Sequence, residues 1–337
     1  MKEIGSEFWD IPIAEKENSL FGDLVQWYVS GRSALSAIIR DIQGCKTVSM
    51  PSWCCDSMIK PFIDAGIEVR FYPVYWDDRL IRELSFDSDI LFIMDYFGYS
   101  GDATDISGYH GVVIRDITHS LFSDFPKDAD YYFGSLRKWC GAWTGGFAWT
   151  KDGQKLPEGC CCDDHYTVLR KKAMRLKEAY ITGPFVYDGN EGKEYLNVFS
   201  EAEDLLEDLD IMAANERDIK LASVMDAEFI RRRRKSNGRI LREAFPDLIM
   251  FSEEADEECP MFIPILVPGH KRDELRRSLI ADNIFCPIHW PVSQYHVLDE
   301  KTRAIYENEL SLVCDQRYNE DDMNRIADAI RLFLKEN

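Results

Sequence analysis

Apolar residues in the first half of the chain follow two alternating patterns. Those between 35 and 42 have the spacing of one helical face, which predicts a helix from about Ser33 to Gly44. A second helical pattern ends at Ala65-Gly66, and residues 68–72 alternate as in a strand. Short continuous apolar runs occur at 47–50, 90–94, 111–114, 131–133 and 146–149. Such runs between helices are typical of strands buried on both faces, so the pattern predicts an α/β fold with a largely parallel sheet.

The pattern changes after Lys151. Residues 151–200 are polar and predict loops, and residues 201–240 predict a helical region that runs from an acidic block to a basic one. We expect the basic block, 231–235, on an exposed or interfacial helix face. A second α+β unit is predicted from strands at 262–267 and 284–288 and helices at 273–282 and 321–334. These patterns predict a large domain over 1–220 and a smaller C-terminal domain over 221–337.

The charge of the chain limits its partners. The 337 residues include 60 acidic and 40 basic ones, for a formal net charge of −20. A chain this acidic repels nucleic acids and anionic membranes, so neither is an expected partner. No apolar run approaches the roughly 20 residues of a membrane-spanning helix, and no signal-peptide pattern opens the sequence. We therefore expect a cytoplasmic protein.

Ten cysteines raise the question of a metal or redox site. None forms a Cys-x-x-Cys pair, and no histidine stands at zinc-finger spacing. Cys160, Cys161 and Cys162 are consecutive and are followed by Asp163, Asp164 and His165. Adjacent side chains diverge and rarely chelate one ion together, so we predict thiols in a loop and no metal site. A metal or redox protein built on this cluster is the least favoured alternative.

Three groups of polar residues lie where strands end or helices begin, which is where ligands bind in open α/β sheets. Gly31, Arg32 and Ser33 open a predicted helix, whose free N–H groups and dipole suit a phosphate. Asp116 follows a strand and precedes His119 by three residues, so the pair can bind a ring through two polar atoms. The alternative is a helix-capping Asp with a surface or core His.

The third group is Ser135-Leu136-Arg137-Lys138, followed by Gly141 and Gly145-Gly146. A lysine forms a Schiff base with a carbonyl when desolvation or a nearby positive charge keeps its amine partly deprotonated. Arg137 and the aromatic residues Trp139 and Trp143 offer both conditions. Taken alone, a lysine is usually a solvated surface residue, so Lys138 needs the context of the other motifs.

Together and in this order, the three groups resemble the fold type I enzymes that use pyridoxal 5′-phosphate (PLP), a cofactor with a phosphate, a ring nitrogen and an aldehyde. Within that class the chain is most similar to the DegT/DnrJ/EryC1/StrS aminotransferases. The resemblance covers most of the chain, weakly in 151–225. The stretches that carry it are Ser30-Gly31-Arg32-Ser33-Ala34-Leu35, Val48-Ser49-Met50-Pro51-Ser52-Trp53, Asp95-Tyr96-Phe97-Gly98, Arg115-Asp116 to His119, and Glu309-Leu310-Ser311-Leu312.

The resemblance implies a fold type I architecture: a large domain with a mainly parallel seven-stranded sheet, a small C-terminal α+β domain, and a homodimer. It assigns Lys138 to hold PLP and move a proton, Asp116 to pair with the pyridinium nitrogen, and His119 to lie near the phenolic oxygen. The phosphate would be bound by Gly31, Arg32, Ser33 and Ser135. Either Trp53 or Cys55 would cover the ring. His289-Trp290-Pro291 resembles a substrate-side segment, or is simply a strand end with a proline turn.

Two features depart from the family pattern. Arg115 stands where an acid usually precedes the pyridinium aspartate, and no Asn-Tyr-Arg-Met-like segment, which helps the family's dimer complete its site, is found between Tyr180 and Phe199. The resemblance implies a PLP-dependent aminotransferase that transfers an amino group, with glutamate as the expected donor, to a keto or aldehyde acceptor such as a nucleotide-linked keto sugar. The alternatives are another PLP reaction (lyase, dehydratase or decarboxylase) and a scaffold or sensor without turnover.

Overall fold

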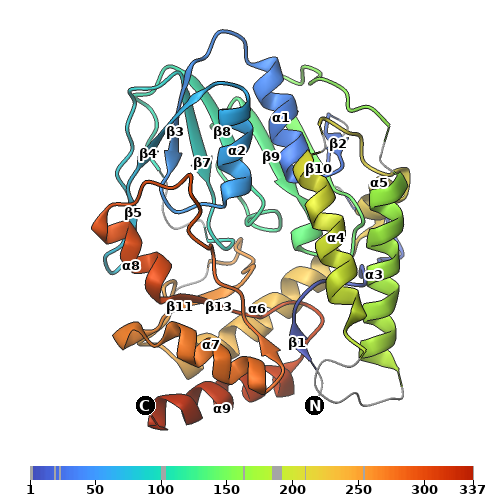
Figure 1. Ribbon diagram of the computed structural model, residues 1–337, viewed down its shortest axis with the longest axis vertical. Coiled ribbons are helices and arrows are strands. Elements are labelled where there is room, and N and C mark those ends of the chain that lie inside the picture. The colour runs from blue at the N-terminus through green and yellow to red at the C-terminus, as the bar shows by residue number, and fades with distance from the viewer. Residues whose placement is uncertain are drawn as a thin grey trace. The chain divides into compact units, whose positions relative to one another are not determined.

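A computed structural model describes residues 3–18, 20–22, 24–99, 104–161, 164–183, 192–208, 210–252 and 255–336 (Figure 1). Two compact units make up the chain, and each contains more than one stretch of sequence. The first unit comprises Met1–Ser6, Gly44–Asp130 and Glu228–Asn337, and the second comprises Glu7–Gln43 and Tyr131–Ala227. The predicted division of the chain at residue 220 stays a prediction.

The first unit contains four parallel strands. They are β3 (Thr47–Pro51), β4 (Glu68–Tyr72), β7 (Ile90–Met94) and β8 (Val112–Asp116). Strands β4 and β7 flank β3, and β8 pairs with β7 so that Met94 lies opposite Asp116. Helix α2 (Asp56–Asp64) connects β3 to β4. Every residue of β7 is buried, as its continuous apolar run predicts. The short hairpin of β5 (Val74–Trp76) and β6 (Leu80–Arg82) precedes β7.

The main sheet has seven strands in the order β2-β10-β9-β8-β7-β3-β4. Its three strands from the second unit are β2 (Gln26–Tyr28), β9 (Tyr131–Ser135) and β10 (Gly146–Thr150). Strand β10 runs antiparallel to both of its neighbours. The predicted α/β fold with a mainly parallel, seven-stranded sheet is thus confirmed.

The helices of the second unit differ from the sequence prediction. They are α1 (Gly31–Asp41), α3 (Asp164–Thr182), α4 (Glu194–Asp208) and α5 (Glu216–Val224). Helix α1 lies where periodicity placed it, but the prediction of loops over 151–200 is wrong for α3 and for the start of α4. Arg170 and Lys177 take buried positions on α3 beside Tyr166 and Ala173, so the buried face does not appear as an apolar stripe.

The C-terminal part of the first unit is an α+β layer. Its helices are α6 (Ala227–Ala244), α7 (Arg272–Ala281), α8 (Glu300–Asn308) and α9 (Glu320–Glu336). Strand β11 (Ile263–Leu266) pairs antiparallel with β13 (Glu309–Leu312), and the N-terminal β1 (Ile4–Gly5) pairs in parallel with β12 (Ile284–Phe285). A single 3₁₀ turn, η2 (Pro268–His270), lies in this layer, and another, η1 (Leu136–Lys138), lies in the second unit.

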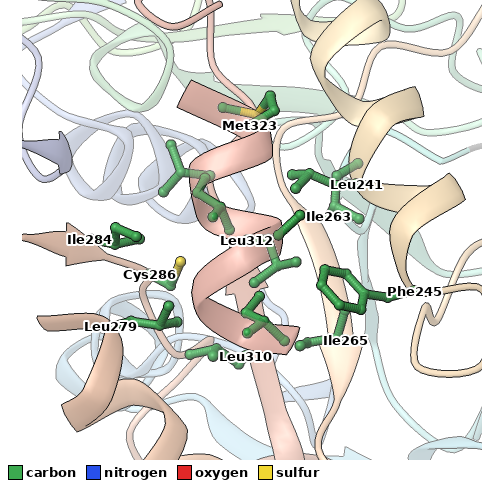
Figure 2. Packing of buried hydrophobic residues seen from close by; sticks show 14 of the residues in the cluster. Leu241, Phe245, Ile263, Ile265, Leu279, Ile284, Cys286, Leu310, Leu312 and Met323 are labelled. Atoms are coloured by element: carbon green, nitrogen blue, oxygen red, sulfur yellow. The ribbon is translucent and has the colours of Figure 1, made fainter. Parts of the chain in front are cut away.

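A hydrophobic core holds this layer together. Figure 2 shows Leu310 and Leu312 of β13 in one apolar cluster with Leu241 and Phe245 of α6 and Met323 of α9. The expected exposure of the basic block 231–235 is wrong for one residue. Arg234 is buried, and its guanidinium donates to Gln316 and to the carbonyl of Met261.

Candidate active site

The predicted phosphate-binding residues open helix α1 in the second unit. Ser30 caps the helix, because its hydroxyl accepts a hydrogen bond from the Ser33 amide at 3.2 Å. A Cβ added to Gly31 would lie 3.4 Å from the Cβ of Ser135, so these two predicted residues are side by side. The structure therefore brings the start of α1 and the end of β9 together, as the predicted phosphate site requires.

Arg32 and Ser33 contribute differently to this predicted phosphate site. The hydroxyl of Ser33 bonds to the backbone of the 210–212 segment, and accepts from the Met212 amide at 2.9 Å. It therefore connects this segment to α1. Arg32 donates from Nη1 to the Leu206 carbonyl, while its buried Nε has no hydrogen-bond partner. The donors that suit an anion here are Arg32 Nε and the amides at the start of α1, apart from the Ser33 amide that already donates to Ser30.

Lys138 lies at the end of η1, directly after β9, and its side chain is exposed. Nearby cations surround the carboxylate of Glu7. Burial raises the Glu7 pKa, but Arg170, Arg137, Lys138 and Lys177 together outweigh this effect and hold it below its ordinary value. Arg137 also pairs with Glu203. Lys138 thus lies among the cations around one buried carboxylate, and its role as a Schiff-base lysine stays a prediction.

Asp116 and His119 lie at the carboxyl end of β8 in the first unit. Asp116 is the last residue of the strand, is buried, and accepts from the Thr118 amide at 2.8 Å. The His119 ring is buried, and its Nδ1 accepts from the Phe97 amide at 3.3 Å. An accepting Nδ1 requires the proton of a neutral imidazole on Nε2. Both residues are therefore held in fixed orientations at a strand end.

The two candidates for covering the cofactor ring have different surroundings. Trp53 is fully buried, stacks on Tyr96 at a ring distance of 4.8 Å, and donates to the His289 carbonyl at 2.6 Å. Cys55 is half-buried at the start of α2, where its sulfur accepts from the Ser57 hydroxyl. Trp53 belongs to a cluster of rings that also includes Phe97, Trp290 and His119.

Arg115 is buried in the first unit and paired with two carboxylates. Its Nη1 lies 2.8 Å from Asp95, and its Nη2 lies 2.6 Å from Asp128. Ser120 donates a further hydrogen bond to Asp95 at 2.6 Å. Because successive side chains of a strand point to opposite faces, the side chains of Arg115 and its neighbour Asp116 lie on opposite faces of β8. The arginine therefore neutralises acids on the face of β8 that Asp116 does not occupy.

A segment that the sequence pattern did not reveal begins helix α5. Asn215-Glu216-Arg217 has an asparagine and an arginine at the spacing of the family's Asn-Tyr-Arg-Met segment, but later in the chain than 180–199. Part of that earlier range, 184–191, lies outside the described residues. The next residue, Asp218, is fully buried and accepts from the amide and hydroxyl of Thr144. Thr144 directly precedes Gly145-Gly146, so the segment is connected to the turn after Lys138.

The cysteine cluster falls only partly within the described structure. Cys162 and Asp163 lie outside the described residues, while Cys160 pairs by a single bridge with Met212. Among the residues described, no group of three His, Cys, Asp or Glu side chains is arranged to bind a metal ion. Nor is any helix in the described ranges both long and apolar enough to cross a bilayer.

The predicted site residues occur in both units. Gly31, Arg32, Ser33, Ser135 and Lys138 lie in the second unit, and Trp53, Cys55, Asp116 and His119 lie in the first. Within each unit they lie at strand ends and helix starts, which is where an α/β sheet binds ligands.

Comparison with solved structures identifies the fold. An aminotransferase of Helicobacter pylori, PseC, involved in the biosynthesis of pseudoaminic acid, matches 98% of this chain and 100% of its own at 13% identity, with a TM-score of 0.62. A sugar aminotransferase of Streptococcus pneumoniae in its PLP form matches 95% of this chain and 91% of its own at 14% identity, with a TM-score of 0.61.

A third match is the DegT DnrJ EryC1 StrS aminotransferase of Brucella abortus. It covers 92% of this chain and 85% of its own at 16% identity, with a TM-score of 0.56. No protein-family model matches the sequence, and no curated protein matches it. The chain therefore has the fold of the fold type I PLP aminotransferases. Across nearly its full length this is the fold of the DegT/DnrJ/EryC1/StrS sugar aminotransferases, as the resemblance in the sequence implies.

Proposed function

We propose that this chain is a PLP-dependent aminotransferase that transfers an amino group, with glutamate as the donor, to a keto or aldehyde carbon of a sugar-like acceptor. The observation that carries the proposal is Lys138 at the end of β9, in a chain that matches sugar aminotransferases over nearly its full length. A nucleotide-linked keto sugar is the acceptor that the sequence resemblance implies, and several of the structural neighbours are described as sugar aminotransferases.

The residues of each unit fit the groups of the cofactor. The first turn of α1, with Arg32 Nε buried and without a hydrogen-bond partner, suits a phosphate in the second unit. The buried carboxylate of Asp116 suits a protonated ring nitrogen in the first unit. When bound, PLP supplies an electron sink that stabilises negative charge on the carbon that carries the amino group.

In this proposal the residues of the chain have distinct roles. Lys138 holds the cofactor and then moves a proton to and from the reacting carbon with its amine Nζ. Asp116 keeps the proton on the ring nitrogen, because a carboxylate favours the charged form of a partner beside it. His119 is the donor to the phenolic oxygen, since its Nδ1 already accepts from Phe97 and its proton lies on Nε2. Gly31, Arg32 and Ser135 bind the phosphate.

We also propose that the protein is a cytoplasmic homodimer. Its support is the match to this class of enzymes, together with Asn215 and Arg217, which have the spacing of the segment through which the family's dimer completes its site. The side chain of Asn215 caps α5 by accepting from the Arg217 amide at 3.0 Å.

Absorption spectroscopy tests the cofactor assignment. The purified full chain incubated with PLP should gain the visible band of PLP covalently bound to a lysine, and Lys138→Ala should lose it. Lys151→Ala is the matched control, because this exposed lysine of the same unit follows β10 and should leave the band unchanged. An unchanged band in Lys138→Ala would contradict the proposal.

The same sample tests the reaction type. L-glutamate should convert the bound cofactor to its amine form with release of one 2-oxoglutarate per site. Release of carbon dioxide or ammonia instead would assign the chain to another PLP reaction. Binding of the cofactor without any response to amino donors would favour a protein without turnover.

A further inference from the structure

Three polar side chains of the first unit form a continuous chain of hydrogen bonds. Glu309 and Ser311 are fully buried on β13, where they alternate with Leu310 and Leu312, which point into the core (Figure 2). His289 follows β12 and is half-buried. Ser311 Oγ lies 2.8 Å from His289 Nδ1 and makes a short hydrogen bond to Glu309 Oε1. The order of the chain is carboxyl, hydroxyl, imidazole.

The backbone fixes one end of this chain. The His289 amide donates to Glu309 Oε2 at 2.8 Å, so Oε2 is an acceptor whatever the protonation state of the carboxyl. We therefore place a proton on Glu309 at Oε1, the atom that faces Ser311, because a hydroxyl there has an acceptor within reach. The direction of the remaining hydrogen bonds then depends on whether Oε1 carries a proton.

With Glu309 ionised, Ser311 donates its proton to Oε1. The serine oxygen then accepts from His289 Nδ1, which places the imidazole proton on Nδ1 and makes Nε2 an acceptor. With Glu309 protonated, Oε1 donates to Ser311, and the serine hydroxyl donates to Nδ1. The imidazole proton is then on Nε2, which becomes a donor. Neither arrangement requires a charged imidazole.

Both arrangements lie within reach near neutral pH. Burial raises the pKa of Glu309 to about 8, against the opposing effects of Ser311, the His289 amide and Arg272. The ionisable groups that face Glu309 are Arg272 of α7, which donates to its backbone carbonyl at 2.9 Å, Cys286 after β12, and His289. Arg272 favours the ionised form and burial favours the protonated one.

We propose that Glu309, Ser311 and His289 form a proton relay whose working end is His289 Nε2. When Nε2 takes a proton from a ligand, the Nδ1 proton moves to Ser311 and the serine proton moves to Glu309, so three N–H or O–H bonds form as three break. The reverse transfer returns a proton to the ligand. Glu309 stores the proton, and the transfer itself needs no charged imidazole.

The position of the ring indicates the kind of ligand. The His289 ring packs against His119 at a ring distance of 5.6 Å and against Phe97 and Trp290, which belong to the first unit's part of the candidate site. The relay suits a substrate hydroxyl or ammonium group, which loses a proton, and a carbonyl oxygen, which gains one. This use of the relay rests on the proposed function, while the relay itself does not. Glu309 and Ser311 are positioning residues.

Nitrogen NMR of the full chain labelled with ¹⁵N-histidine tests the relay without cofactor or substrate. Long-range ¹H–¹⁵N spectra report which ring nitrogen carries the proton, and the His289→Phe variant assigns the signals. In the wild type the proton should change from Nε2 to Nδ1 as the pH rises through about 8. Glu309→Gln cannot ionise, and its amide donates to Ser311, so the His289 proton should stay on Nε2 as the pH rises through about 8.

Two controls make this test specific. Glu307→Gln changes an exposed carboxylate of α8 next to His270 and should leave the His289 transition in place. Ser311→Ala removes the middle of the chain and should uncouple His289 from Glu309. A wild-type His289 with one tautomer across the range, or the same transition in Glu309→Gln, would overturn the relay. Because no cofactor is added, these outcomes are independent of the absorption test of Lys138.

Discussion

Arg115 shows at the level of single residues how a departure from a family pattern is accommodated. Its side chain is 3% exposed and pairs with Asp95, 10% exposed, and Asp128, 33% exposed. A buried carboxylate without a cation or enough donors is costly. Arg115 and the two aspartates therefore form one group of charges that compensate each other. The aspartates lie 20 and 13 residues from Arg115 in the chain.

We expect Arg115→Met to destabilise the protein by about 3–5 kcal/mol, because the change leaves Asp95 buried without its cation. Urea denaturation followed by circular dichroism measures the loss. Arg70→Met is the matched control, since Arg70 pairs with Glu68 of the same sheet at an exposed position and its loss should not shift the midpoint. Equal midpoints for the two variants would show that the buried pairs do not contribute to stability.

At the level of elements, the start of α1 depends on a close approach of strand β10. A Cβ added to Gly146 would lie 1.9 Å from the Ser30 carbonyl oxygen and 2.9 Å from the Gly31 nitrogen. Both are backbone atoms, which a rotamer change cannot relieve. The glycine after the Lys138 turn is thus required for the helix start that we propose as a phosphate site.

We expect Gly146→Ala to cost about 3 kcal/mol or more, at the upper end of overpacking effects, and to weaken PLP binding. Gly22→Ala in the same unit is the control, because a Cβ there meets nothing within 4 Å. Thermal melts and titration with PLP measure both effects. Equal behaviour of the two variants would contradict the close packing of β10 on α1.

Helix α3 was not predicted from the sequence, because charged residues occupy part of its buried face. Its buried residues include Arg170 and Lys177 beside Tyr166, Leu169 and Ala173. The long stems of arginine and lysine pack against apolar neighbours while their charges find partners, here Glu7 and Glu203 for Arg170. A hydropathy pattern counts these positions as polar, so the helical stripe is hidden.

For the whole molecule, Glu309 links folding to pH. Its pKa is raised from an ordinary 4.5 to about 8, so between these values the folded chain holds a proton that the unfolded chain releases. The stabilisation that the Glu309 carboxyl contributes to the folded state is fully present below about pH 4.5, and it is lost as the pH rises through about 8. Asp315 and Asp299 have lowered pKa values, so their contribution to stability is lost as the pH falls. That loss occurs only below the ordinary pKa of an aspartate.

We therefore expect the free energy of unfolding to fall between about pH 5 and pH 8, by at most about 1.4 kcal/mol per pH unit, and then to level off. Glu309→Gln should remove this slope, because glutamine does not titrate, and Glu307→Gln should keep it. Urea midpoints measured across this range provide the check. A slope that survives in Glu309→Gln would assign the pH dependence to another group.

Much of the fold could be predicted because parallel strands buried on both faces leave a continuous apolar run. The run Ile90–Met94 predicts β7, and the helical spacing after Ser33 predicts α1, since both signals are local. The order of Gly31, Asp116 and Lys138 along the chain likewise led to the cofactor that we propose. These inferences need only neighbours in the sequence, the order of motifs and the periods of strand and helix.

The partners of polar groups were decided only by the tertiary structure. Ser33 was expected at a phosphate, yet its hydroxyl bonds to the backbone near Met212. Glu309, Ser311 and His289 form one network although His289 lies 20 residues before Glu309 in the chain. A buried donor or acceptor must find a partner wherever the fold brings one, and no local pattern records that choice. The sequence by itself determined the strands, the first helix and the type of fold, while packing determined which charges and hydroxyls meet.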